Sequence, residues 1–390
     1  MRRRAAWVPV ANKVIGTWAP RRRDAEPLAA LAEHARSLEK SDHHLDQGFT
    51  DDMTVLWQAF TTAEDLSPIG RLALRQDVVR RLAIRLRVAA QPGRLAQRPL
   101  RPVFVIGLPR SGTTLLHRLL ADAPGLRAPM LFELLDPRPA GTGQSLRAMR
   151  AGLTVASSRA LAPATRAMHP LHARQPEECS FLLPHGLFHH ARIRVPGYLA
   201  WLAERADNAA AEDYRYLGRQ LRFIDNQDAP SRWVLKCPAH LWSLRALLAA
   251  FPDATLVWVH RDPLVALPSW CSLTEATMGM HTDPDLVDLT VLGRDWLQIW
   301  AQALTRAMRV REHADPARFI DVPYAELTHA PASAIARVLA QLGEHPPPAG
   351  AVPRSGTSPH HYDLPRYGLE PASILDAFAG YVRRFAAEVS

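Results

Sequence analysis

The chain has 390 residues, 47% of them hydrophobic, and a formal net charge of +9. This length and apolar content suffice for one large domain or two ordinary ones with a sizeable core. Lysine occurs only at Lys13, Lys40 and Lys236, so the positive charge reflects a general preference for arginine and is poor support for a nucleic-acid partner. Three scattered cysteines favour the reducing cytoplasm, and no apolar run is long enough for a membrane span.

The N-terminal part is expected to be helical. Helical periodicity runs through 27–40 and 70–90, within a segment 1–100 that we expect to pack on a main domain, 101–390. The main domain opens with the β-branched run VFVIG at 103–107, which predicts a short buried strand of a parallel sheet. A glycine-containing turn and an apolar-periodic helix follow this strand.

Three more strands are predicted further along the chain. They lie at 232–236, 254–260 and 318–324 and alternate with helical stretches, and after a proline-rich loop at 345–366 a closing helix is expected at about 371–388. This alternation predicts an α/β fold: a P-loop-type parallel β-sheet flanked by helices, with an N-terminal helical extension. Ligands of such sheets bind beyond the carboxyl ends of the strands.

The turn after the first strand has the chemistry of a phosphate site. It reads GLPRSGTT from Gly107, which keeps the two-glycine spacing of a P-loop, and its backbone amides and the following helix N-terminus suit a phosphate. The nucleotide-hydrolysing version of this loop has lysine directly after the second glycine, but Thr113 stands there and the cation is Arg110, inside the loop. A magnesium-nucleotide, kinase-like enzyme is therefore the less favoured alternative.

This stretch resembles the first signature of sulfotransferases that use 3'-phosphoadenosine 5'-phosphosulfate (PAPS), best in their bacterial, tyrosyl-protein-sulfotransferase-like branch. The resemblance implies that the 5'-phosphosulfate is held by Arg110, Ser111, Gly112, Thr113 and Thr114. It also implies a second signature for the 3'-phosphate, an arginine and a serine eight residues apart after another strand. Arg261 and Ser269 have this spacing, and the planar fork of an arginine suits a phosphate.

The implied reaction is in-line sulfuryl transfer to a hydroxyl of a small molecule, lipid or glycan, with adenosine 3',5'-bisphosphate (PAP) as the product and no metal. Such transfer needs a cation at the leaving oxygen and a base for the acceptor proton. Lys236, at the end of a predicted strand, is the candidate cation together with Arg110. A non-catalytic member of the fold is a further alternative, although the expected cations are all present.

The base is open between two residues. Glu133 is placed first, because tyrosyl-protein sulfotransferases carry a catalytic glutamate in this neighbourhood. Their glutamate lies two residues nearer the loop than Glu133 does. His240 is the rival, because cytosolic sulfotransferases use a histidine two residues after the matching lysine, where this chain has a spacing of four. Glu177 and Glu178 are outside candidates that would line the acceptor pocket.

A near copy of the first motif, PRSGTS, occurs at 353–358. No strand leads into it and Pro359 follows it, so it does not have the context of a second phosphate cradle. By resemblance, Arg354, Ser355 and Gly356 would instead lie on a C-terminal loop that closes over the nucleotide end of the donor. The histidine pairs of the chain lack the spacing of a metal site. A homodimer and a peripheral membrane contact are the remaining partners that we consider.

Overall fold

The computed structural model describes residues 7–18, 26–91, 100–205, 207–225, 232–345 and 363–389. Its centre is a five-stranded parallel sheet with the order β2-β3-β1-β4-β5. The strands are β1 Val103–Gly107, β2 Leu126–Arg127, β3 Arg232–Lys236, β4 Thr255–His260 and β5 Phe319–Pro323. The four predicted strands and the parallel sheet are thereby confirmed. The edge strand β2 was not predicted, because two residues are too few to carry a pattern.

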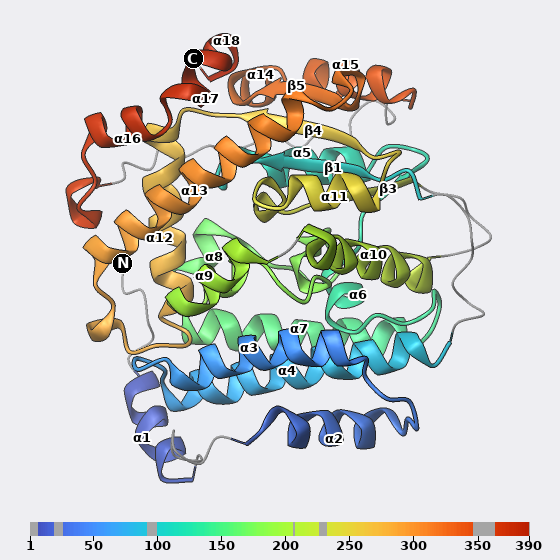
Figure 1. The fold of residues 1–390 in the computed structure, drawn as a ribbon, viewed down its shortest axis with the longest axis vertical. Coiled ribbons are helices and arrows are strands. Elements are labelled where there is room, and N and C mark those ends of the chain that lie inside the picture. The colour runs from blue at the N-terminus through green and yellow to red at the C-terminus, as the bar shows by residue number, and fades with distance from the viewer. Residues whose placement is uncertain are drawn as a thin grey trace.

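Helices cover both faces of the sheet (Figure 1). Val103 and Val105 of β1 face one cluster, which the apolar sides of α5, α14 and α15 complete, whereas Phe104 and Ile106 face the larger cluster on the other side. This division follows from the alternation of side chains along a strand. The helices of this part of the chain are α5 Thr113–Ala121, α6 Leu131–Leu135, α7 Gln144–Leu161, α8 Thr165–Met168, α9 Pro196–Glu204, α10 Asp207–Ile224, α11 Leu244–Ala250, α12 Pro263–Met278, α13 Leu289–Glu312, α14 Tyr324–His329 and α15 Pro331–Leu342.

The N-terminal segment is helical, as expected, and joins the larger core. It contains α1 Val8–Trp18, α2 Leu28–Glu39, α3 Gln47–Thr62 and α4 Pro68–Ala89. Buried side chains of α2, α3 and α4 belong to the same apolar cluster as Phe104 and Ile106 of β1. Figure 1 shows α3 and α4 below α10, on the side of the molecule away from α15.

The C-terminus departs from the expected single helix. The segment forms three short helices instead, α16 Pro371–Ala377, α17 Ala379–Arg384 and α18 Ala386–Val389. The breaks fall at Phe378 and Phe385, which are both buried. The ring of Phe385 stacks on His260 at the end of β4, with 4.1 Å between centroids. The helical path is therefore interrupted where aromatic side chains turn inward to cover the sheet.

None of the described helices combines the length and the hydrophobicity that a bilayer-spanning segment needs. Because all five strands are parallel, their carboxyl ends lie at one edge of the sheet. The loops after β1, β3 and β4 therefore meet at this edge, and they carry the predicted site residues.

Candidate donor and transfer site

The loop after β1 has an unusual backbone that only certain residues accept. Gly107 and Gly112 have φ angles of 147° and 88°, and Arg110 has a φ of 68°. A Cβ atom on Gly107 would lie 2.4 Å from the carbonyl oxygen of Val259, so β1 and β4 approach too closely there for any side chain. The loop is thus fixed by glycine at both ends and turns sharply at Arg110.

The loop leads directly into the N-terminus of α5. The first backbone hydrogen bond here is donated by Leu116 to the carbonyl of Gly112, at 3.1 Å. The amides of Thr113 and Thr114 precede this bond and have no partner within the helix. Amides in this position, with the positive end of the helix dipole, favour an anion.

Arg110 joins the two predicted signatures. Its Nε donates to the hydroxyl oxygen of Ser269 at 3.0 Å, although 159 residues separate the two in sequence. Its Nη1 donates to the carbonyl of Met168 at 2.6 Å. Both partners are neutral, so the guanidinium charge is held in place without being neutralised by them.

Arg261 completes the same corner. Its Nη1 donates to the carbonyl of Arg110, and its guanidinium lies 3.9 Å from the ring centre of Tyr324. The preceding residue, His260, is fixed by Asp321 at 2.7 Å and by the hydroxyl of Tyr381 at 3.2 Å. Two guanidiniums and the Ser269 hydroxyl therefore converge beyond the ends of β1 and β4, which is an arrangement suited to a phosphate group.

Sequence reasoning did not include Tyr324 in this corner. It directly follows β5, so its position at a strand end was the available signal. Its ring supports Arg261 on one side and lies 3.0 Å from where a Cβ of Gly112 would stand. Tyr324 therefore packs the loop against the guanidinium.

Lys236 lies at the end of β3 and is 1% exposed. Its Nζ donates to Oε1 of Glu178 at 2.6 Å. Burial by itself would lower the pKa of Lys236, but the carboxylates of Glu178 and Glu177 outweigh it and raise the pKa above its ordinary value. The ammonium is thus charged and paired, and the paired carboxylate comes from the segment 177–178 that the sequence offered only as an outside candidate.

Glu177 is held by a different partner. Its Oε1 lies 3.1 Å from Nε2 of His169. Burial would raise the pKa of Glu177, but His169 and Lys236 together lower it overall. Burial and the nearby Lys236 ammonium also lower the pKa of His117 to about 3, and Nε2 of His117 contacts the carbonyl of Val234 at 3.2 Å.

Glu133 has a structural task in this structure. One carboxylate oxygen accepts from Arg127 at 2.5 Å, and the other accepts from the backbone amide of Met130 at 2.9 Å, where it caps the first turn of α6. Arg127 also lies over the ring of Trp233, 4.4 Å from its centre. Both oxygens of this carboxylate are therefore already engaged in structural hydrogen bonds.

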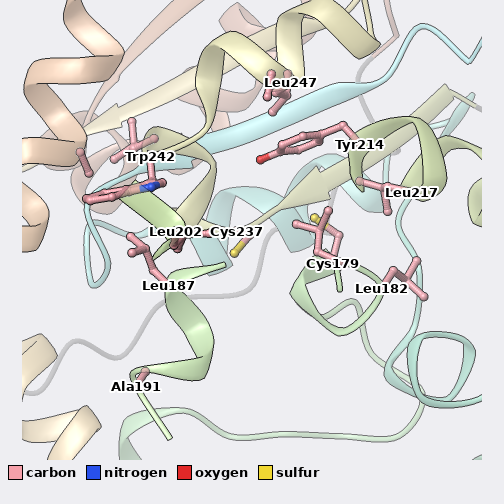
Figure 2. Close-up of a cluster of buried hydrophobic side chains, with 14 of the residues drawn as sticks. Cys179, Leu182, Leu187, Ala191, Leu202, Tyr214, Leu217, Cys237, Trp242 and Leu247 are labelled. Carbon is pink, nitrogen blue, oxygen red and sulfur yellow. The ribbon is translucent and has the colours of Figure 1, made fainter. Parts of the chain in front are cut away.

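His240, the rival candidate base, lies in the core. The side chain is fully buried, with Nδ1 2.9 Å from the hydroxyl of Tyr214 and Nε2 3.1 Å from the sulfur of Cys179. Figure 2 shows both of these partners within the cluster of buried hydrophobic side chains. Burial, with a contribution from Lys236, lowers the pKa of His240 to about 3.

Arg354, Ser355 and Gly356, which were predicted to close over the donor, lie outside the described residues. His189, a member of one of the histidine pairs, is buried and contacts the carbonyl of Pro184 at 2.9 Å. Among the described residues, no three His, Cys, Asp or Glu side chains come together in an arrangement suited to a metal ion.

Comparisons with known proteins show the family and the fold of this chain. The model of a family described as the sulfotransferase family matches residues 102–347, more than half of the chain. The chain is 28% identical over 253 residues to the omega-hydroxy-beta-dihydromenaquinone-9 sulfotransferase Stf3 of Mycobacterium bovis. That match covers 62% of this chain and 62% of the relative, so less than two thirds of the relative's length is represented.

Two solved structures resemble the whole fold. Sulfotransferase STF1 from Mycobacterium tuberculosis has a TM-score of 0.76 and 28% identity, over 92% of this chain and 99% of that chain. Sulfotransferase STF9 from Mycobacterium avium has a TM-score of 0.80 and 26% identity, over 93% of this chain and 97% of that chain. With the two signatures folded into one corner and the family model matching most of the main domain, the chain belongs to the sulfotransferase family.

Proposed function

We propose that this protein transfers a sulfuryl group from PAPS to a hydroxyl acceptor. The observation that carries the proposal is the meeting of Arg110, Arg261 and Ser269 beyond the ends of β1 and β4, in a chain of the sulfotransferase family. The kinase-like alternative is not favoured, because Thr113 occupies the place of the nucleotide-binding lysine.

The residues present fit such a donor. The amides of Thr113 and Thr114 at the start of α5 would hold the 5'-phosphosulfate, together with Arg110. Arg261 and Ser269 would hold the 3'-phosphate, because an arginine fork and a hydroxyl are suitable donors to phosphate oxygens. PAPS supplies the activated sulfuryl group, and the protein positions it.

The transfer step is assigned to Lys236 and Glu178. A bond forms between the acceptor oxygen and sulfur while the bond from sulfur to the 5'-phosphate oxygen breaks, and that oxygen keeps the electron pair. Lys236 would stabilise the negative charge on this oxygen, and Glu178 would take the acceptor proton. We place Glu178 ahead of Glu133 and His240 because it touches Lys236 and is 24% exposed, whereas the other two are buried and bound to structural partners.

The acceptor that we favour is a hydroxyl on a large apolar molecule. A cavity of about 740 Å³ lies where α3, α9 and the neighbouring ends of α12 and α13 meet. Its walls combine apolar side chains, among them Met278 and Trp296, with charged ones, among them Arg194, Asp288 and Asp295. Met278 is nine residues beyond Ser269 on α12, roughly 13 Å along the helix axis. The Mycobacterium bovis relative is named for a hydroxylated menaquinone, which is consistent with an apolar acceptor.

Donor binding can be tested first. PAP without magnesium should raise the melting temperature of the protein, because a ligand that binds only the native state stabilises it. A shift that requires ATP and magnesium, with none from PAP, would reject the proposal. Incubation of labelled PAPS with hydroxylated isoprenoid lipids or with soluble glycans, and identification of the sulfated product, would then establish the acceptor class.

A further inference from the structure

Most of the net positive charge of this chain comes from one short segment. Residues 1–23 contain six arginines and one lysine and no aspartate or glutamate. The other 40 basic residues of the chain are nearly balanced by its 38 acidic residues. Almost the whole net charge of +9 therefore belongs to the segment that contains α1, with arginine at each of positions 2–4 and 21–23.

Helix α1 has one side on the protein and one side exposed. Val8 is 1% exposed, and the side-chain oxygen of Asn12 accepts from the backbone amide of Ile69 at 3.1 Å, which attaches the helix to α4. Trp7, Val10 and Val14 are 49%, 63% and 59% exposed. Their spacing of three and four residues puts them within an arc of about 60° on the helix surface. The exposed side is thus an apolar stripe.

The composition of this stripe favours a membrane surface over a protein partner. Trp7 is the only aromatic residue among the exposed large hydrophobic side chains of the described residues, and tryptophan prefers the interface between lipid and water. An apolar stripe with flanking cations supplies the two signals that stable attachment to an anionic membrane needs. With 11 residues, α1 is too short to span a bilayer, so it can only lie in its surface.

We propose that α1 binds an anionic lipid surface, with Trp7, Val10 and Val14 inserted among the headgroups. The arginines at 2–4 and 21–23 contribute their charge to the attraction of an anionic surface. The helix then holds the enzyme at the bilayer while the donor site, at the carboxyl ends of the strands, stays in water. This attachment does not depend on the sulfuryl-transfer reaction or on the choice of acceptor.

The test is co-sedimentation of the full chain with vesicles of phosphatidylglycerol mixed with phosphatidylcholine, and with vesicles of phosphatidylcholine alone. We expect binding to the anionic vesicles that weakens as salt rises, and much weaker binding to the neutral ones. The combined substitutions Trp7→Ser, Val10→Ser and Val14→Ser should reduce the partition onto anionic vesicles by about tenfold or more, because the apolar contact is lost while the charge remains.

The chain offers a matched control on α7. Leu146, Met149 and Leu153 are also exposed, at 48%, 58% and 63%, and have the same spacing. Changing these three to serine should leave vesicle binding within about twofold of the unsubstituted chain, since the arginine clusters at both ends of α1 are not involved. Equal binding by the α1 variant, or loss of binding only in the α7 variant, would overturn the proposal.

The same samples show whether the variants fold and whether the stripe binds a second subunit instead of a membrane. Both variants should keep the melting-temperature shift that PAP produces, because neither changes the donor corner. If the unsubstituted chain is a dimer and the α1 variant is a monomer with unchanged vesicle binding, the stripe is a subunit interface and the membrane proposal fails. Loss of vesicle binding without a change in oligomeric state supports it.

Discussion

The loop after β1 and the segment around the end of β3 lie at one edge of the sheet, yet their charged groups are partnered in opposite ways. Arg110 is bound to neutral oxygen atoms of Ser269 and Met168, so its charge is kept for an incoming anion. Lys236 is already paired with Glu178. In the proposed reaction the first region would therefore receive the donor phosphates with its charge available, whereas the second would exchange an internal partner when substrates bind.

The largest expected effect comes from separating the three candidate bases. Glu178→Gln should reduce kcat by about 100- to 10,000-fold, the usual contribution of a general base. Glu133→Gln and His240→Gln should have smaller effects on kcat, because their side chains are held by Met130 and by Tyr214. Turnover is measured per molecule that binds PAP, which corrects for misfolding. If Glu133→Gln is the most impaired variant, the assignment returns to Glu133.

The second-largest effect on kcat is expected from removal of the Lys236 ammonium. Lys236→Ala should lower kcat by roughly 100- to 1,000-fold through the loss of charge stabilisation on the leaving oxygen. Lys40→Ala, which removes an exposed lysine, is the control for losing a positive charge elsewhere.

The pairing of Lys236 with Glu178 also predicts a pH effect on the free energy of unfolding. Because Glu178 helps to hold the pKa of Lys236 above its ordinary value, the stabilisation is present below that ordinary value and is lost as pH rises through the folded-state pKa.

The donor side should respond in affinity more than in turnover. Arg261→Ala should weaken PAP binding roughly 10- to 100-fold, the range for hydrogen bonds to a charged group. Ser269→Ala should weaken it by only about twofold to tenfold, because a neutral hydroxyl contributes less. Calorimetric titration with PAP measures both. A fall in kcat at unchanged PAP affinity in Arg261→Ala would place this arginine on the transfer side.

The smallest effect concerns the buried imidazole. The pKa of His240 is lowered to about 3 in the folded chain. Below about pH 6.5 the imidazole is therefore protonated in the unfolded chain but remains neutral in the folded chain. Stability should therefore fall with decreasing pH, and His240→Gln should reduce the slope by up to about 1.4 kcal/mol per pH unit between pH 6 and about pH 4. Urea unfolding at several pH values gives this slope, with the exposed His313→Gln as control. An unchanged slope would contradict the neutral, buried state of His240.

The sequence named residues that the fold brings together in the proposed donor corner, and the reason is physical. A strand, a glycine-containing turn and a helix N-terminus are contiguous, so the spacing of Gly107, Arg110 and Gly112 already encodes the cradle. Arg261 follows a buried strand, and parallel strands end at a common edge. What the sequence could not give is the direct contact of Arg110 with Ser269, which depends on the packing of α12 against the loop.

By itself, the sequence determined the parallel α/β fold, and it proposed the phosphate loop and the second signature, because each depends on residues that are close along the chain. Only the tertiary structure decided which carboxylate meets Lys236. Glu178 is 58 residues away from it in sequence and is brought there by the short helical turn η3, Cys179–Phe181, packed beside β3. The roles of Glu133 as a helix cap and of His240 as a core residue were decided in the same way, because burial and hydrogen-bond partners are properties of the folded chain.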